Sequence, residues 1–271
     1  MLTKRREALI VGLCLVTAVV ALLPYVEFSK NGIRLNFYSL SEERKLGETT
    51  SRQFESRFRL VNEPAIQAYL QQLGTKIASG VNNPGFKFEF RMLDSPVLNA
   101  VALPGGFIYV TRGLALKVQS EGELAAVLAH EIAHVVSRHG TEQLSHGQLM
   151  GFISTLGGFA SPLPDLLTSL ERLSYSRGDE MRSDDLAVRY LYQAGYHPDA
   201  VASFFEVLLR ATREAKIPDF LSTHPLSADR IVRTRGLFST WPLDGRLIRD
   251  SGAFKEFQAL LRARTPETQG K

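Results

Sequence analysis

Five consecutive residues, His130 to His134, have the types and spacing of a helical metal site. They read H-E-I-A-H. Residues four apart on an α-helix lie on one face about one turn apart, so both imidazoles can reach one ion. Glu131 lies between them in angle, where it can act as a general base toward a water at that ion. The pattern indicates a zinc site of the kind found in metallopeptidases.

The surrounding residues favour the helix that this site needs. Residues 123–138 contain neither Gly nor Pro, and Gly140 follows as an expected stop. Two His and a Glu could also be ordinary residues of such a helix. A run of apolar residues precedes His130, however, so this turn should be buried. Buried imidazoles and carboxylates need partners, and one metal ion would serve all three side chains.

A catalytic zinc site uses three protein ligands, so the third must come from another segment. The best candidate is Glu180, which is four residues before Asp184 on a predicted helix. One of these carboxylates can bind zinc, while the other accepts the free ring N–H of a ligand histidine. Asp179 and Asp185 are close enough to leave the choice open, and composition alone favours a solvated acidic face.

The composition bounds the remaining possibilities. The chain has 271 residues, of which 44% are hydrophobic and 22% charged, and its formal net charge is +4. These values are ordinary for one globular domain with appendages. No cluster of Lys and Arg is interleaved with aromatic residues, so nucleic-acid binding finds no support. The single cysteine, Cys14, excludes a disulfide within the chain.

A basic segment precedes an apolar run at the N-terminus. Basic residues at positions 4–6 are followed by the apolar residues 8–23. This pattern predicts a signal peptide or signal anchor over residues 1–28, and we expect an uncleaved anchor because no clear A-x-A cleavage site follows. The run is slightly short for a spanning helix, and Tyr25, Val26 and Phe28 could extend it to the membrane interface, with Tyr25 as an aromatic anchor. Either form places the body of the chain outside the cytoplasm.

A second apolar stretch, residues 149–164, contains several Gly and Pro residues and is too short and too broken to span a bilayer. It is either a helix packed on the core or a mobile flap beside the site that contacts membrane or substrate.

The remaining pattern predicts helices, then a small sheet, then more helices. Phe86–Leu93 alternates apolar and polar residues as a strand, and 99–103 and 107–111 flank a Pro-Gly-Gly turn as a hairpin. Helices are predicted within 41–78, 171–193, 201–215, 226–238 and 253–264, with a loop at 219–224. The fold class is therefore α+β. We expect a mostly helical, zincin-type domain over 36–240 and a partly disordered C-terminal extension over 241–271.

Four motifs in this order resemble those of the HtpX/BepA-like metallopeptidases, family forty-eight of the zinc peptidases. They are N-A-V-A-L-P-G-G-F-I-Y-V-T-R-G-L from Asn99, H-E-I-A-H-V-V-S-R-H-G from His130, S-R-G-D-E-M-R-S-D from Ser176 and S-T-H-P-L-S-A-D-R-I from Ser222. The resemblance extends from about Leu40 to Ile231. It implies that Glu180 is the third zinc ligand and that Asp184 supports the site. Ser183 stands where the family usually has Ala.

The resemblance also implies roles for a T-H-P-x-x-x-x-R element. His224 would lie near the zinc, where it could donate to the oxyanion on the scissile carbonyl. In periplasmic relatives the matching histidine can instead occupy the open zinc position and hold the enzyme inactive. Arg230 would support the site or simply pair with an acidic helix. His139 and His146 are poorer candidates, and His139 should point away from the ligand face.

The strand 107–111 looks like the substrate strand of this family. An extended peptide could pair with its edge through backbone hydrogen bonds, which gives little side-chain specificity and suits unfolded substrates. An ordinary sheet strand is the alternative. The residues expected to bind substrate are Asn99, Gly106, Phe107, Ile108 and Tyr109.

Together these features predict an endopeptidase with one Zn²⁺ per chain that hydrolyses unfolded or misfolded polypeptides. The N-terminal helix would hold it at the inner membrane of a bacterial envelope, with the catalytic domain on the periplasmic side; a cleaved, periplasmic form is the alternative. A rival hypothesis is a chaperone-like or adaptor protein with a latent, His-plugged zinc site. A membrane-embedded prenyl-protein protease would need several spanning helices, and only one segment qualifies.

Overall fold

The structure is a computed structural model that describes residues 26–29, 32–156, 174–213 and 219–263. The chain divides into two compact units. The larger comprises residues 40–140 and 164–271, and the smaller comprises residues 1–39 and 141–163. Every residue predicted to bind metal or substrate, or to support the site, lies in the larger unit.

The larger unit contains a three-stranded sheet with the order β3-β5-β4. Strand β3 (Glu89–Leu93) runs parallel to β5 (Phe107–Thr111), and β4 (Ala100–Leu103) runs antiparallel to β5. The turn η2 (Pro104–Gly106) joins β4 to β5, and its two glycines have φ values of 77° and 104°, a region that favours glycine. The predicted pair of strands around a glycine turn is confirmed.

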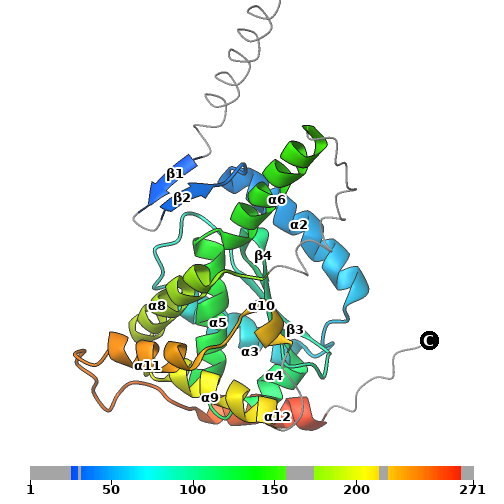
Figure 1. The fold of residues 1–271 in the computed structure, drawn as a ribbon. Coiled ribbons are helices and arrows are strands. Elements are labelled where there is room, and N and C mark those ends of the chain that lie inside the picture. Colours follow the sequence, from blue (N-terminus) through cyan, green and yellow to red (C-terminus); the bar gives the residue numbers. More distant parts are fainter. Residues whose placement is uncertain (1–25, 30–31, 157–173, 214–218, 264–271) are drawn as a thin grey trace, which may run out of the picture. The chain divides into compact units, whose positions relative to one another are not determined.

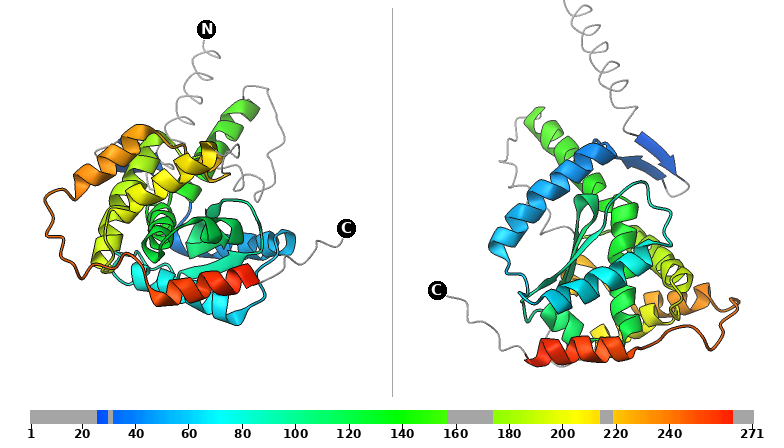
Figure 2. Two further views of the ribbon diagram at one scale, coloured as in Figure 1. Left: turned by 90° about the horizontal axis from the view of Figure 1, so that it is seen from below. Right: turned by 180° about the vertical axis from the view of Figure 1, so that it is seen from behind.

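Helices cover both faces of this sheet (Figures 1 and 2). Helix α2 (Leu40–Arg57) packs on one face, where Phe54 lies 4.7 Å from the ring centroid of Tyr109. Helices α3 (Pro64–Ala78) and α5 (Glu121–Val136) pack on the other face. Because side chains alternate along a strand, each strand contributes to two different cores.

Helix α5 carries the H-E-x-x-H residues. It begins after Ser120, whose hydroxyl accepts the Glu123 N–H as an N-cap, and it ends at Val136. The predicted boundaries, 123–138, are each two residues late. The helix stops before Gly140 because Arg138 adopts a left-handed backbone conformation with φ 59°, and α6 (His139–Leu156) begins at the next residue.

The remaining helices of the larger unit follow the predicted order. Ser176 and Asp179 form a capping box that starts α8. A short helix, α10, occupies part of the predicted loop 219–224. The elements are α4 (Arg112–Lys117), α8 (Arg177–Gln193), α9 (Ala200–Arg213), α10 (Phe220–Thr223), α11 (Ala228–Leu237) and α12 (Gly252–Ala263).

The C-terminal part of the chain belongs to the same compact unit as the site. Helix α12 packs on α3 and α4, and its residues Phe254, Phe257 and Leu261 are buried in the hydrophobic core. Side chains within residues 241–263 therefore pack in or against this core, and the domain limit at residue 240 stays a prediction. Residues 264–271, which we expect to be disordered, lie outside the described residues.

In the smaller unit, β1 (Val26–Ser29) pairs antiparallel with β2 (Gly32–Leu35). The expectation that Val26 and Phe28 extend the apolar N-terminal run is wrong, because both belong to this hairpin. The run 8–23 lies outside the described residues. Among the helices that the structure describes, none is both long enough and apolar enough to cross a membrane.

The second apolar stretch, 149–164, is described only in part. Residues 149–156 continue α6 as a helix, and the choice between a helix packed on the core and a flap beside the site stays a prediction. Residues 157–164 lie outside the described residues.

Candidate metal centre

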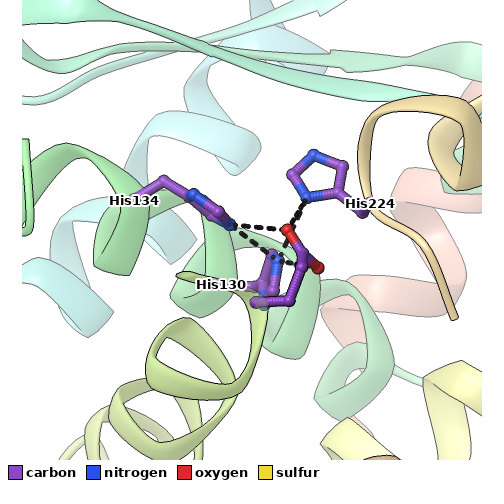
Figure 3. Close-up of side chains that lie close together, drawn as sticks. His130, His134 and His224 are labelled. Carbon is purple, nitrogen blue, oxygen red and sulfur yellow. Dashed lines mark hydrogen bonds and ion pairs between the residues drawn. The ribbon is translucent and has the colours of Figure 1, made fainter. Parts of the chain in front are cut away.

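Two helices and a loop bring four metal-binding side chains together. His130 and His134 come from α5, Glu180 from α8, and His224 follows α10; one ligand atom of each lies within 4.8 Å of all the others. All four residues are buried. Figure 3 shows the three imidazoles converging on one point. The predicted third ligand is thus brought next to the H-E-x-x-H pair.

The distances within this cluster fit a metal site. The Nε2 atoms of His130 and His134 are 3.0 Å apart, and His134 Nε2 is 3.3 Å from Glu180 Oε1. Two imidazole nitrogens and a carboxylate oxygen are one of the ligand sets that catalytic zinc sites use. Burial lowers the pKa of His134, which keeps its ring neutral as a metal ligand requires.

Glu131 is the most enclosed side chain of the site, with 0% of its surface exposed. Neither of its oxygens has a hydrogen-bond partner of good geometry in the described part of the chain. Its Oε1 lies 3.6 Å from His224 Nε2. Burial raises the pKa of this carboxyl, while the nearby His224 and His130 and, to a smaller extent, the Ala102 backbone N–H lower it. An unpaired buried carboxylate with a raised pKa is suited to accepting and releasing a proton.

Asp184 and Arg230 support the ligands from outside the cluster. Asp184 Oδ1 lies 3.1 Å from His130 Nδ1, on the side of the ring that faces away from the other ligands. Arg230 donates to both oxygens of Asp184 at 2.7 Å. Burial by itself lowers the pKa of His130, but the hydrogen bonds to Asp184 and Glu180 outweigh it and raise this pKa to about 9. The predicted supporting positions of Asp184 and Arg230 agree with this geometry.

Arg230 also ties the ligand helix to the loop that carries His224. Its Nη1 lies 2.7 Å from Glu180 Oε2 and donates to the carbonyl oxygen of Pro225 at 2.8 Å. Within the loop, His224 Nδ1 lies 2.9 Å from Glu180 Oε1. The position of His224 is therefore determined from two sides.

His139 is placed differently from the prediction. We expected it to point away from the ligands, but its Nδ1 lies 3.0 Å from His134 Nδ1, and its Nε2 lies 3.5 Å from Asp179 Oδ1. The expectation assumed that the helix continues through residue 139. The left-handed Arg138 instead turns the chain back, so that His139 contacts the outer nitrogen of a ligand. His146 is exposed and lies in α6, within the smaller unit.

Tyr175 was not identified from the sequence. Its ring centroid lies 3.9 Å from that of His134, and its backbone N–H donates to the Thr223 carbonyl at 3.1 Å. Burial raises the pKa of its phenol. The only sequence signal was its place directly before Ser176, the cap of the helix that carries Glu180.

The prediction of β5 as an edge strand for substrate is wrong. Strand β5 is the central strand, paired with β3 and β4, and the side chains of Phe107, Ile108 and Tyr109 are buried. A Cβ added to Gly106 would meet the Lys87 carbonyl oxygen at 2.7 Å, so this glycine serves backbone packing. The sequence could not show this, because β3 joins β5 from the opposite side as a parallel partner.

The strand beside the motif helix that has a free edge is β4. Thr111 N–H donates to the Asn99 carbonyl, so Asn99 and Val101 direct their backbone groups toward β5. The backbone groups of Ala100 and Ala102 therefore point away from β5. Ala102 lines a small cavity together with His134 and Tyr175, and its N–H is close enough to Glu131 to affect the pKa of that carboxyl, so this outer edge lies next to the metal cluster. No described strand pairs with it.

The fold and the site define a metallopeptidase of the H-E-x-x-H class. The model of peptidase family M48 matches residues 64–237, and the chain belongs to this family.

Curated proteins similar to this chain come from bacteria and from mitochondria. The chain is 28% identical to the beta-barrel assembly-enhancing protease of Shigella flexneri and 29% identical to that of Yersinia pestis, in each case over 73% of this chain and 44% of the relative. It is 29% identical to the mitochondrial metalloendopeptidase OMA1 of Schizosaccharomyces pombe, over 77% of this chain and 64% of the relative. The chain thus spans less than half the length of these bacterial relatives.

Proposed function

We propose that this protein is a zinc-dependent endopeptidase that hydrolyses peptide bonds in unfolded or misfolded envelope proteins. The observation that carries the proposal is the buried cluster of His130, His134 and Glu180 beside a Glu131 that has no hydrogen-bond partner in the described chain. These three side chains would hold the ion, and Glu131 would act as the general base.

The side chains around the cluster have separate roles in the proposed mechanism. A zinc ion held there supplies a Lewis acid, which lowers the pKa of water and polarises the scissile carbonyl. Glu131 takes a proton from the attacking water and passes it to the leaving amine. Asp184 Oδ1, 3.1 Å from His130 Nδ1, would accept the Nδ1–H of this ring and so direct the Nε2 lone pair toward the ligand cluster. Arg230 holds Asp184 in place.

The free edge of β4 offers a place for the substrate. A peptide in extended conformation can pair with the outward backbone groups of Ala100 and Ala102, as in other cases of β-strand addition. Because Ala102 lies next to Glu131, this pairing would bring a peptide bond to the general base. Binding through the backbone requires an unfolded segment, which supports misfolded polypeptides as the substrate class.

The proposed location follows from the N-terminal pattern and from the names of the relatives. Two of these relatives are named for β-barrel assembly, and one is a mitochondrial protein. We propose that the N-terminal segment anchors the protein at the inner membrane of a bacterial envelope, with the site on the periplasmic side; a cleaved periplasmic form is the alternative. Determining whether the mature protein begins at Met1 or after a cleavage near Ala21 separates the two forms.

A second candidate function is favoured by the position of His224. Its imidazole lies 3.3 Å from His130 Nε2 and 2.9 Å from Glu180 Oε1, among the atoms that would bind the ion. A site with four protein ligands is closed. This geometry supports a chaperone-like or adaptor protein with a latent site, or a peptidase that His224 keeps inactive at rest.

The test compares Glu131→Gln with the wild type on an unfolded casein substrate. General-base catalysis contributes roughly 100- to 10,000-fold, so we expect cleavage to fall by that factor. Glu123→Gln, on the same helix but at its N-terminal turn, is the control and should cleave at the wild-type rate. Equal cleavage by Glu131→Gln and wild type would contradict the peptidase mechanism.

His224→Ala then distinguishes the two candidate functions. If His224 closes the site at rest, its removal should increase casein cleavage. If His224 assists the reaction, cleavage should fall. A zinc-loaded His224→Ala variant without any cleavage, together with an inactive wild type, would favour the latent adaptor.

A further inference from the structure

A pocket of about 240 Å³ lies beside the free edge of β4, on the face of the sheet that α2 covers. Its apolar walls come from the end of α2, from the segment before β4, and from the sheet; they include Phe54, Phe58, Val97, Val101 and Tyr109. Small-molecule sites typically enclose about 300–1,000 Å³. A pocket below this range is suited to one side chain.

The walls of this pocket are aromatic and reach the solvent. Phe58 is 39% exposed although it is large and apolar. It lies 4.5 Å from Phe54, which in turn lies 4.7 Å from Tyr109, measured between ring centroids. An exposed aromatic wall in a hollow is typical of a surface that binds an apolar group.

The pocket is continuous with the proposed substrate edge. Val101 directs its backbone groups to β5, while its neighbours Ala100 and Ala102 direct theirs outward. In a peptide paired with this edge, the residue opposite Val101 places its side chain on the same face of the sheet as Val101. That face is the one with the pocket, so this side chain would enter it.

Asn99 supplies a second, independent observation. Asn99 lines the same pocket, and its Oδ1 atom is buried and has no hydrogen-bond partner among the described residues. A buried amide oxygen without a partner costs free energy unless a ligand satisfies it. A peptide N–H arriving at this edge would be such a donor.

The pocket is also linked to the loop that carries His224. Asp219 lines it and directly precedes α10, and the adjacent Phe220 N–H donates to the Leu98 carbonyl at 3.1 Å. The pocket therefore lies between the aromatic end of α2 and the start of the short helix that leads to the metal cluster.

We propose that this pocket is a specificity subsite that selects a large apolar side chain, such as Leu, Met or Phe, at one position within about two residues of the cleaved bond. The inference rests on the proposed peptidase function and on pairing of the substrate with β4. It changes one expectation from the sequence, namely that backbone pairing leaves little side-chain selection. An unfolded protein would then be cut where its normally buried residues are exposed.

The experiment maps cleavage positions in a library of unfolded peptides with the full-length, zinc-loaded protein. One methylene in an apolar pocket changes kcat/KM by roughly 10- to 200-fold. We therefore expect peptides with Leu or Phe at the selected position to be cut at least about tenfold faster than peptides with Ala. A flat profile at every position near the cut, with peptides still cleaved, would overturn the pocket and leave the peptidase function intact. Absence of cleavage of any peptide would overturn the proposed function itself.

Two pocket variants with opposite effects sharpen the test. Phe58→Ala removes a wall and should reduce the preference for large residues several-fold. Val97→Trp should fill the pocket and shift the preference to Gly and Ala. Leu260→Ala, at a residue that is 44% exposed on α12, is the matched control and should keep the wild-type profile. If both pocket variants fold and keep that profile, as they would if another segment of the chain occupies the pocket, the inference is wrong.

Discussion

Two of the three buried glutamates of helix α5 have opposite surroundings. Glu121, in its first turn, accepts hydrogen bonds from the hydroxyls of Tyr69, Tyr196 and Ser251. Glu131, in its middle, accepts none of good geometry from the described residues. Both side chains are at most 7% exposed, so burial alone does not separate them.

The difference in hydrogen bonding corresponds to a difference in role between the two carboxylates. Glu121 joins α3, the turn after α8 and the segment before α12, so its hydrogen bonds are complete and hold the unit together. Glu131 is held by its helix alone, and its oxygens remain available to a reacting molecule. Within one helix, complete hydrogen bonding marks a structural acid and incomplete hydrogen bonding marks a reactive one.

The largest effect should come from removing the third ligand. Glu180→Ala takes away one of three protein ligands and should lose most bound zinc, by at least about 100-fold in affinity, since even the outer partners of ligands are worth 10- to 100-fold. Metal analysis of the purified variants measures this. Asp185→Ala is the control, because Asp185 pairs with Arg233 at a partly exposed position outside the cluster. Equal zinc retention in both variants would contradict the assignment of Glu180.

His139→Ala tests whether a residue beyond the end of α5 supports the metal ligands. Because His139 contacts the outer nitrogen of His134, its loss should weaken zinc affinity by about 10- to 100-fold while the fold is kept. A competition titration with a chelator measures the affinity. His146→Ala, at an exposed histidine of the smaller unit, should bind zinc like the wild type. The same affinity in all three proteins would reduce His139 to a packing residue.

Glu121→Gln tests the structural end of the helix. The amide cannot accept all the hydroxyls that the carboxylate accepts, and leaving buried donors unsatisfied costs about 1–3 kcal/mol. We expect the free energy of unfolding in urea to fall by that amount, while casein cleavage per folded molecule stays unchanged. Loss of cleavage at unchanged stability would mean that both glutamates are reactive and would remove the contrast.

The smallest effect should be a loss of folding stability as the pH rises into the alkaline range. Burial, and then the hydrogen bond to Glu121, raise the pKa of Tyr69 and of Tyr196 above the ordinary value of 10.0. The folded protein keeps both phenols protonated, so their contribution to stability is complete below about pH 10 and is lost as the pH rises above it. Melting temperatures between pH 8 and 11 measure this decline. Tyr196→Phe removes one of the two phenols and should show a shallower decline.

The residues that the sequence could identify have local signals. The H-E-x-x-H spacing and the Glu180–Asp184 pair each depend on one helix. They appear where the patterns and the resemblance to the family place them.

The features that the sequence missed depend on contacts between distant segments. The left-handed backbone at Arg138, which turns His139 back to the ligands, occurs at a residue type without preference for that conformation. The free edge at β4 depends on the parallel pairing of β3 with β5. The same holds for Tyr175, which reaches His134 only because the segment before α8 pairs with Thr223.

The ligands of the metal centre are far apart along the chain, and this has a consequence for folding. His134 and Glu180 are separated by 46 residues, and His130 and Glu180 by 50. An ion held by these side chains would act like a covalent cross-link that closes loops of these lengths. In the chain-entropy model, a link across about 50 residues lowers the conformational entropy of the unfolded chain by the equivalent of about 4 kcal/mol. A chain with a single cysteine has no intramolecular disulfide to do this. The same ion would thus serve both as the reactive centre and as a cross-link that stabilises the larger unit. Removal of the ion by a chelator should therefore lower the free energy of unfolding of that unit.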